Sequence, residues 1–469
     1  MRSLIAVLVA VTIPGALVAQ APTEAAQKEA REILKEMVSL NTSLQRGDVT
    51  PLAEKLAARF RAAGVPAADV QLIGPEVKNK NLVVRLRGTG KAKPVLFLAH
   101  LDVVDAMRTD WSFDPYALTE KDGWLYGRGT ADDKGPATTV MAAALALVRS
   151  HATHDRDIII AFTSGEENGD VPGAEWLVKN HKELVDAEWV FNFDAGGPAL
   201  ERGRVPWIEL QGSEKVYYTI AMSVHNSGGH SSLPRADNAI YRLVSALRNF
   251  QTLTFPIDIT AIARAQLTAQ LPFVPSSDAP VIRAALAEPL DSNAAYRLTR
   301  VSPSYNALLR TTCIPTMLTA GVAENALPPL ATATINCRII PGENSADILR
   351  AIRRVVDDTA VTFTDVTAAK PSPPSPLLPE RIALVKAAAR ATWGRDIPVT
   401  PVQENGATDG LFFRNAGVPV YGVTGIAIGE ERMHGNDERI PVKSLREGVT
   451  FATALMRETA GGKVAARKK

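Results

Sequence analysis

The sequence predicts an α/β protein with a mainly parallel central sheet flanked by helices, together with a smaller α+β domain that has an antiparallel sheet. In the first half of the chain, short apolar segments alternate with helical ones, which is typical of strands buried on both faces of a parallel sheet. From about Gln211, apolar and polar residues alternate instead, as in a sheet with one exposed face. The 469 residues, 46% hydrophobic and 22% charged, are typical of a globular chain of two or three domains.

The elements of the larger domain follow from this pattern in order. Residues from Thr23 to Ala63 are predicted to form two helices, separated by a loop from Asn41 to Pro51. Continuous apolar runs then predict buried strands, and an alanine-rich run predicts a helix between the first two of them. The strands are 94–99, 157–162, 188–193 and 418–423, and the helix is 136–149.

The smaller domain is predicted from the segments between about residues 216 and 356. The strands are 216–224, 311–321 and 331–340, and the helices are 239–250 and 346–356. The proline-rich stretch from Lys370 to Pro379 is predicted to be a linker, after which helix and strand patterns resume.

Charge and cysteine content narrow the classes of function. Lysine and arginine number 52 and aspartate and glutamate 50, so the net charge is +2 and gives no reason to expect nucleic acid or an anionic membrane as a partner. Two cysteines cannot form a disulfide framework or a cysteine-rich zinc site. Seven histidines and many carboxylates leave a metal site of histidine, aspartate and glutamate open.

The N-terminus has the pattern of a secretory signal peptide over residues 1–21. Arg2 precedes an apolar run from Leu4 to Ala19, and Ala19-Gln20-Ala21 fits the small-residue cleavage pattern. The alternative is an uncleaved anchor helix, but Pro14 and Gly15 interrupt the run, and it is shorter than the roughly 20 apolar residues that span a bilayer. We therefore expect an exported protein, periplasmic or secreted, with no membrane partner after cleavage.

Polar residues follow the predicted strands or lie in glycine-rich turns. His100 directly follows one strand, where ligands of open α/β sheets bind, and Asp102 is placed to hold its second ring nitrogen. In Gly127-Arg-Gly-Thr-Ala-Asp-Asp-Lys-Gly135, two adjacent carboxylates require neutralising cations, which a divalent metal would supply. The alternatives are a core histidine paired with an aspartate, and a turn in which Arg128 and Lys134 neutralise the carboxylates.

Three further positions complete the candidate site. Glu166 and Glu167 follow the next strand, where one glutamate can bind metal while the other handles a proton. Asp194 follows a third strand, and His434 lies in Met433-His-Gly-Asn-Asp-Glu438 after the last one. Taken singly, each has a plainer interpretation, namely a solvated acidic loop, a capping aspartate and a surface histidine. Together these nitrogen and oxygen ligands suit zinc, cobalt or manganese, and a bridging carboxylate would let two ions share a hydroxide.

The ordered motifs HLD, GRGTADDKG, SGEEN, FDAG and MHGNDE resemble those of the dinuclear-zinc family of glutamate carboxypeptidase, carnosinase-type dipeptidases, succinyl-diaminopimelate desuccinylase and aminoacylase. The resemblance covers essentially the whole mature chain and implies two divalent ions, most commonly zinc. It implies that Asp132 bridges the ions, that Glu166 is the general base and that Asp102 orients His100. One ion would be held by His100, Asp132 and Asp194, and the other by Asp132, Glu167 and His434.

The resemblance also implies a catalytic domain, residues 22–212 and 367–469, interrupted by a lid and dimerisation domain at 213–366. Within the lid, His230 rather than His225 matches the family histidine that reaches the active site of the partner subunit in a homodimer. Asn325 and Arg338 match substrate contacts, with Arg338 on a carboxylate, and the loop at Gly406 resembles a substrate-binding loop. Residues from about 255 to 310 exceed a minimal lid and are expected to add helices to it.

These features predict a metal-dependent amide hydrolase that acts on a peptide and releases its C-terminal amino acid, as a carboxypeptidase or dipeptidase. The main alternative is an aminoacylase or desuccinylase that acts on N-acyl amino acids, because it would use the same site. A non-catalytic interaction protein is a third hypothesis. Such a protein would be expected to lack a metal ligand or the base, whereas this sequence contains all of them. The sequence contains no G-x-S-x-G motif for serine catalysis.

A disulfide between Cys313 and Cys337 is also predicted in the smaller domain. The midpoint of the two positions falls at Asn325, in the turn between two strands, so an antiparallel hairpin would place the cysteines nearly opposite each other. Export to an oxidising compartment would permit the bond. The alternative is a pair of buried free thiols on opposite faces after a slip in strand register.

Overall fold

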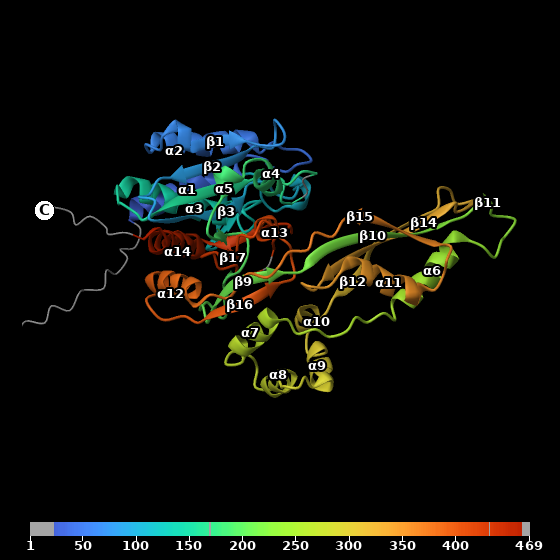
Figure 1. The fold of residues 1–469 in the computed structure, drawn as a ribbon. Coiled ribbons are helices and arrows are strands. Elements are labelled where there is room, and N and C mark those ends of the chain that lie inside the picture. Colours follow the sequence, from blue (N-terminus) through green and yellow to red (C-terminus); the bar gives the residue numbers. More distant parts are fainter. Residues whose placement is uncertain (1–22, 168–169, 431, 462–469) are drawn as a thin grey trace, which may run out of the picture.

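The computed structural model describes residues 23–167, 170–430 and 432–461, and the predicted signal peptide lies outside them. Two parts are visible in Figure 1, a large sheet covered by helices and a long, narrow sheet that extends away from it. No helix within the described ranges is long and apolar enough to cross a membrane.

The large sheet is mixed, with four central strands parallel to one another. Its order is β1-β2-β6-β3-β7-β17-β9-β16, with β8 paired to β9. Strands β6, β3, β7 and β17 are parallel, β1 and β2 are antiparallel additions at one edge, and β9 and β16 run antiparallel to β17 at the other. The strands are β1 Val70–Ile73, β2 Asn81–Leu86, β3 Ala92–His100, β6 Arg156–Thr163, β7 Val190–Asn192, β8 Gly197–Pro198, β9 Ile208–Glu214, β16 Val399–Glu404 and β17 Val420–Gly422. The predicted parallel sheet is confirmed.

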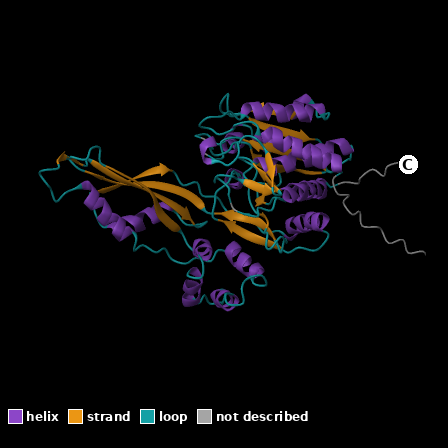
Figure 2. Cartoon of the chain, turned by 180° about the vertical axis from the view of Figure 1, so that it is seen from behind, coloured by secondary structure: helices purple, strands orange, loops and turns teal. Residues whose placement is uncertain are grey.

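Helices cover both faces of this sheet (Figure 2) because successive strand residues point to opposite sides. In β3, Phe97 joins a core with α1, α2, α3, α12 and α14, whereas Leu96 and Leu98 join a core with α4, α5 and α13. The helices are α1 Glu24–Val38, α2 Thr50–Ala62, α3 Lys134–Ser150, α4 Gly173–Asn180, α5 Lys182–Val185, α12 Pro379–Trp393, α13 Gly410–Asn415 and α14 Val442–Ala460. A small sheet of β18 Arg439–Pro441, β5 Trp124–Tyr126 and β4 Thr119–Lys121 lies outside the large one.

The second sheet is antiparallel, as the alternating pattern predicts, and its order is β12-β14-β10-β15. Helices α6 Ala239–Phe250 and α11 Ser345–Val356 pack on it through one shared apolar core. The strands are β10 Val216–His225, β12 Thr312–Ala320, β14 Leu330–Ile339 and β15 Val361–Thr367, and a two-stranded ribbon of β11 Gly229–His230 and β13 Ala326–Leu327 lies at the tip.

The predicted disulfide between Cys313 and Cys337 is confirmed. The two residues lie opposite each other where β12 pairs with β14, and their Cα atoms are 4.0 Å apart. Cys337 is fully buried in the core beneath the sheet. The bond therefore ties β12, the edge strand of this antiparallel sheet (the predicted lid), to its neighbour β14.

Four added helices occupy the segment where the sequence predicts an enlarged lid, but they pack differently from that expectation. They are α7 Ala261–Gln270, α8 Ala279–Ala285, α9 Ser292–Thr299 and α10 Pro303–Leu309, and they share a core of their own. Helix α7 packs against β16 of the large sheet, and Gln403 on that strand bonds to Thr260, Gln266 and the Leu308 carbonyl. The insert is thus anchored to the edge of the large sheet, because its hydrogen-bonding partners lie there.

Candidate metal centre

Three parallel strands end side by side and deliver most of the candidate ligands. His100 is the last residue of β3, Glu166 and Glu167 follow β6, and Asp194 follows β7. Because parallel strands end at the same edge of a sheet, residues far apart in sequence meet there. Asp132 lies in the turn before α3, and His434 lies in the loop before β18.

Asp132 lies between the two histidines. Its Oδ1 atom is 3.0 Å from Nε2 of His100, and its Oδ2 atom is 3.0 Å from Nε2 of His434. Nε2 of His100 is also 3.5 Å from Oδ1 of Asp194, and Nε2 of His434 is 3.0 Å from Oε2 of Glu167. The five residues predicted as metal ligands therefore converge, with one carboxylate shared between two histidine and carboxylate pairs.

The carboxylates of this cluster are not neutralised by lysine or arginine side chains of the described chain. Lys134 donates instead to the Leu40 carbonyl, and Arg128 pairs with Glu438 at 2.6 Å, so the salt-bridged turn is not what forms. Burial, together with the nearby Asp132 and Glu167 carboxylates, raises the pKa of Asp194 to about 7, although the neighbouring His100 opposes the shift. Hydrogen bonds to Asp132 and Glu167 raise the pKa of His434 to about 10. Such a donor set fits divalent cations, which would relieve the repulsion among the carboxylates.

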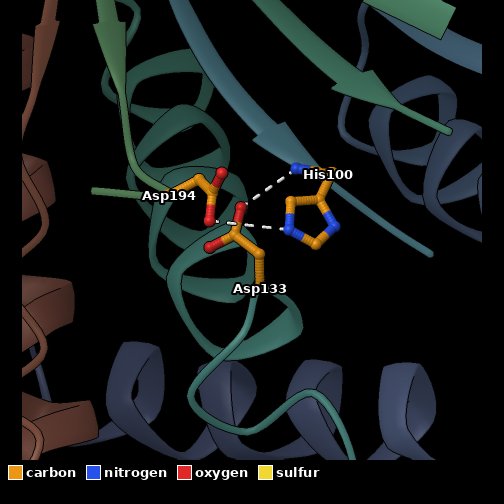
Figure 3. Close-up of side chains that lie close together, drawn as sticks. All are labelled: His100, Asp133 and Asp194. Atoms are coloured by element: carbon orange, nitrogen blue, oxygen red, sulfur yellow. Dashed lines mark hydrogen bonds and ion pairs between the residues drawn. The ribbon is translucent and has the colours of Figure 1, made fainter. Parts of the chain in front are cut away.

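Two buried oxygen atoms without hydrogen-bond partners also suit a bound cation. Oε1 of Glu167 and Oδ1 of Asp133 are buried with no hydrogen-bond partner. Figure 3 shows Asp133 beside His100 and Asp194, close enough for the three to hold a cation together. Oδ2 of Asp133 accepts the backbone N–H of His100 at 2.9 Å, so this residue also holds the end of β3 in place. The sequence assigns no role to Asp133, although it stands next to Asp132 in the same motif.

Asp102 makes two different contacts. Its backbone carbonyl is 3.0 Å from Nδ1 of His100, whereas the nearer atom of its carboxylate is 3.8 Å away. The carboxylate instead accepts the backbone N–H groups of Glu166 and Glu167, at 3.3 and 3.0 Å. Asp102 therefore holds His100 through its main chain and the two glutamates through its side chain.

Glu166 lies close enough to the candidate ligands Asp194 and His100 for both to act on its carboxyl group. Burial and the Asp194 carboxylate hold the pKa of Glu166 well above its usual range, with His100 opposing them. A carboxylate whose proton affinity is raised in this way is suited to accept and return a proton near neutral pH.

Glu438 binds the turn that carries Asp132. It belongs to the motif around His434, but the sequence alone assigns it no role. Its carboxylate is fully buried and accepts the backbone N–H groups of Gly129, Ala131 and Asp132, at 3.1, 2.7 and 3.1 Å. Arg128 joins this network and donates to the His434 carbonyl as well. Glu438 thus shapes the turn that carries Asp132. Its position four residues after His434 is the sequence feature from which a role near the site could have been predicted.

The three predicted lid residues fall into two places. His230 and Asn325 lie together at the tip, where β11 pairs with β13 and Ser231 donates to the Asn325 carbonyl at 3.0 Å. The tip is at the end of the antiparallel sheet that lies farther from β3 (Figure 1), so the chain does not bring His230 to its own candidate ligands. Arg338 lies on β14 at the other end of the antiparallel sheet and donates to the Asn405 carbonyl at 3.3 Å, next to Gly406.

Comparison with known proteins places these observations in a family. The model of peptidase family M20/M25/M40 matches residues 96–458. The human N-fatty-acyl-amino acid synthase/hydrolase PM20D1 is 30% identical over 378 residues, which cover 78% of this chain and 74% of that protein. A probable carboxypeptidase S-like 2 of Dictyostelium discoideum is 28% identical over 82% of this chain and 75% of its own.

A solved structure shares the fold. The M20 family metallo-carboxypeptidase Sso-CP2 from Sulfolobus solfataricus superposes with a TM-score of 0.70 at 16% identity, covering 91% of this chain and 98% of that one. Fold and site together define a metal-dependent hydrolase of amide bonds. The chain belongs to peptidase family M20/M25/M40.

Proposed function

We propose that this protein hydrolyses the amide bond next to a free carboxylate in peptides and releases the C-terminal amino acid, as a carboxypeptidase or dipeptidase. The observation that carries the proposal is Asp132, whose two oxygens face one histidine each at 3.0 Å. That arrangement suits a carboxylate shared by two divalent ions, zinc in our proposal, with cobalt or manganese as substitutes. His100, Asp132 and Asp194 would hold one ion, and Asp132, Glu167 and His434 the other.

The bound ions would activate a water molecule and polarise the substrate carbonyl. In this proposal Glu166 takes the proton of that water and returns it to the leaving amine. Its main-chain N–H is held by Asp102, which keeps the carboxylate in place during the reaction. Arg338, stacked 4.6 Å from the Tyr217 ring and close to the Gly406 loop, would bind the substrate carboxylate.

His230 is proposed to donate a hydrogen bond to the scissile carbonyl, with Asn325 beside it as a substrate contact. The backbone N–H of Ser232 points at Nδ1 of His230, at 3.2 Å, and an N–H group can only donate. Nδ1 must therefore carry its lone pair, which places the proton of the neutral ring on Nε2. That proton is free to be donated, and His230 is exposed at the lid tip.

Because His230 is remote from the ligands of its own chain, we propose that it serves the active site of a partner subunit in a homodimer. The lid carries the exposed apolar surface that such a dimer needs. It comprises Ile314, Met317 and Leu318 on the edge strand β12, which are 63%, 62% and 61% exposed, and Tyr241 and Val244 on α6. Residues 22–212 and 367–469 would form the catalytic domain and 213–366 the lid, in a protein exported after removal of residues 1–21.

A second candidate is hydrolysis of N-acyl amino acids. It is favoured by the similarity to PM20D1, whose name describes an N-fatty-acyl-amino acid synthase/hydrolase. The same cluster and the same Arg338 would serve both reactions, since each substrate has a carboxylate beside the scissile amide.

The test compares a panel of dipeptides with a matched panel of N-acetyl and N-palmitoyl amino acids, using purified protein with added zinc. We expect release of the C-terminal amino acid, abolished by a chelator and restored by zinc. A wild-type protein that hydrolyses neither panel with zinc, cobalt or manganese would contradict the proposal. Faster hydrolysis of the N-acyl panel would select the second candidate.

A further inference from the structure

Two neighbouring residues of the Gly406 loop, Thr408 and Asp409, contact the strands that carry the candidate ligands. Oδ2 of Asp409 accepts the hydroxyl hydrogen of Thr163 at 2.6 Å, and both residues are buried. Thr163 is the last residue of β6, three positions before Glu166. The hydroxyl of Thr408 accepts a hydrogen bond from the Asn192 side-chain amide at 3.2 Å.

Asn192 continues this link toward the third strand end. It is the last residue of β7, and its side-chain oxygen accepts the backbone N–H of Asp194 at 3.4 Å. Thr408 and Asp409 therefore contact β6 just before the glutamates and β7 just before Asp194. These links come from a loop that lies more than 200 residues later in the chain.

Thr408 is also bound by Glu214, which lies at the connection between the two sheets, here called the hinge. Oε2 of Glu214 accepts the Thr408 backbone N–H at 3.1 Å and its hydroxyl at 2.9 Å. Oε1 of Glu214 forms an ion pair with Arg414 at 2.8 Å, and both side chains are at most 3% exposed. Glu214 is the last residue of β9, and only Lys215 separates it from β10 of the lid.

We propose that Asp409 is a positioning residue, which sets the end of β6 so that Glu166 and Glu167 keep one geometry relative to Asp194, whose strand β7 is bound by Thr408, and that Glu214 couples this setting to the lid hinge. A buried hydrogen bond of this kind fixes the direction of the strand end. The Oδ1 atom of Asp409 is buried without a hydrogen-bond partner. No local contact therefore offsets the free energy that is lost when this oxygen is removed from water. The inference rests on the proposed metal-centre role of the three acidic residues.

The test uses isosteric changes at Thr163. Thr163→Val removes the hydroxyl that donates to Asp409 at 2.6 Å and lies 3.2 Å from the Ala99 carbonyl, whereas Thr163→Ser keeps both contacts. Thr400→Val is the matched control, since Thr400 is fully buried on β16 and its hydroxyl has no partner. Cobalt affinity is measured by absorption titration of the metal-free proteins, and kcat and KM are measured at saturating cobalt.

We expect Thr163→Val and Asp409→Ala each to weaken cobalt binding or lower kcat by about 10-fold, with KM changed less, and Thr163→Ser to retain wild-type values. The double variant Thr163→Val with Asp409→Ala should lose no more than either single variant, because both break the same link. Cobalt affinity and kcat of Thr163→Val equal to those of Thr400→Val would overturn the inference. If wild-type protein hydrolyses no amide, the proposed function fails, and the cobalt titration still decides the role of Asp409.

Discussion

At the scale of single residues, Asp132 and Asp102 each contact more than one residue of the candidate site. Asp132 faces both histidines, and Asp102 holds His100 by its main chain and the two glutamates by its carboxylate. Neighbouring carboxylates therefore have different surroundings, although their chemistry is the same. Both glutamates donate their main-chain N–H groups to Asp102, but of their two side chains only that of Glu167 contacts His434 within the described residues.

This difference predicts different consequences for two isosteric changes. Glu166→Gln should lower kcat by at least about 100-fold, because it removes the proton acceptor. Metal content, measured by plasma mass spectrometry, should stay at the wild-type value. Glu167→Gln should lower metal content instead, and added zinc should restore part of its activity. Near-normal turnover of Glu166→Gln would exclude its role as the base.

At the scale of elements, the connection between the two sheets is short and buried. Lys215, the single residue between β9 and β10, donates to the carbonyls of Ala307 and Arg310 at 2.9 and 2.8 Å. It thereby attaches the end of the helical insert to the hinge. Burial lowers the pKa of Lys215 to about 7, and nearby Arg338 adds to the shift while Glu343 opposes it.

The lowered pKa of Lys215 predicts a pH dependence of stability. The unfolded lysine binds a proton up to about pH 10.5, whereas the folded one loses it above about pH 7, so the free energy of unfolding should rise with pH between these values. Lys215→Met should flatten that rise by about 1 kcal/mol or more between pH 7 and pH 9, measured by urea denaturation. Lys182→Met, at an exposed position on α5, serves as the control and should follow the wild type. Identical slopes for wild type and Lys215→Met would contradict the expectation.

The lid sheet depends on its edge strand, which the disulfide secures. Replacing both Cys313 and Cys337 with serine should lower the free energy of unfolding by about 2–4 kcal/mol, because the unfolded chain loses a constraint. Wild-type protein in reducing buffer should match this variant, and thiol titration of denatured, unreduced protein should find no free thiol. Two free thiols in protein purified from its native compartment would show that the bond does not form there.

At the scale of the whole molecule, the two sheets carry different sets of candidate site residues. The large sheet gathers the candidate ligands at one edge, and the lid sheet carries His230 and Asn325 at its distant tip and Arg338 at its base (Figure 1). A complete site with His230 therefore requires either a large lid movement or a second copy of the chain.

Mixing two inactive variants distinguishes these arrangements. His230→Ala lacks the lid donor and Glu166→Gln lacks the base, so a hybrid dimer contains one site with both groups intact if His230 acts on the partner. We expect a mixture of the two to regain up to about a quarter of wild-type activity after subunit exchange, since half the dimers are hybrids with one complete site each. No recovery, with exchange demonstrated by mass spectrometry, would place His230 in the active site of its own chain.

The sequence alone determined the elements and the chemistry of the strand ends. Apolar periodicity predicted the parallel sheet and the antiparallel lid, because burial of strand residues depends on local spacing. The position of His100, Glu167 and Asp194 after strands predicted their meeting, because parallel strands end at a common edge. The hairpin midpoint likewise predicted that Cys313 and Cys337 would face each other.

Only the tertiary structure decided which side chains contact one another across long stretches of chain. It placed the helical insert against β16, turned the Asp102 carboxylate toward the glutamates, and joined Asp409 to Thr163 and Glu438 to the turn before Asp132. These contacts join residues up to about 300 positions apart. No local pattern encodes them, since they depend on how the sheets and helices pack and on which buried polar group finds a partner.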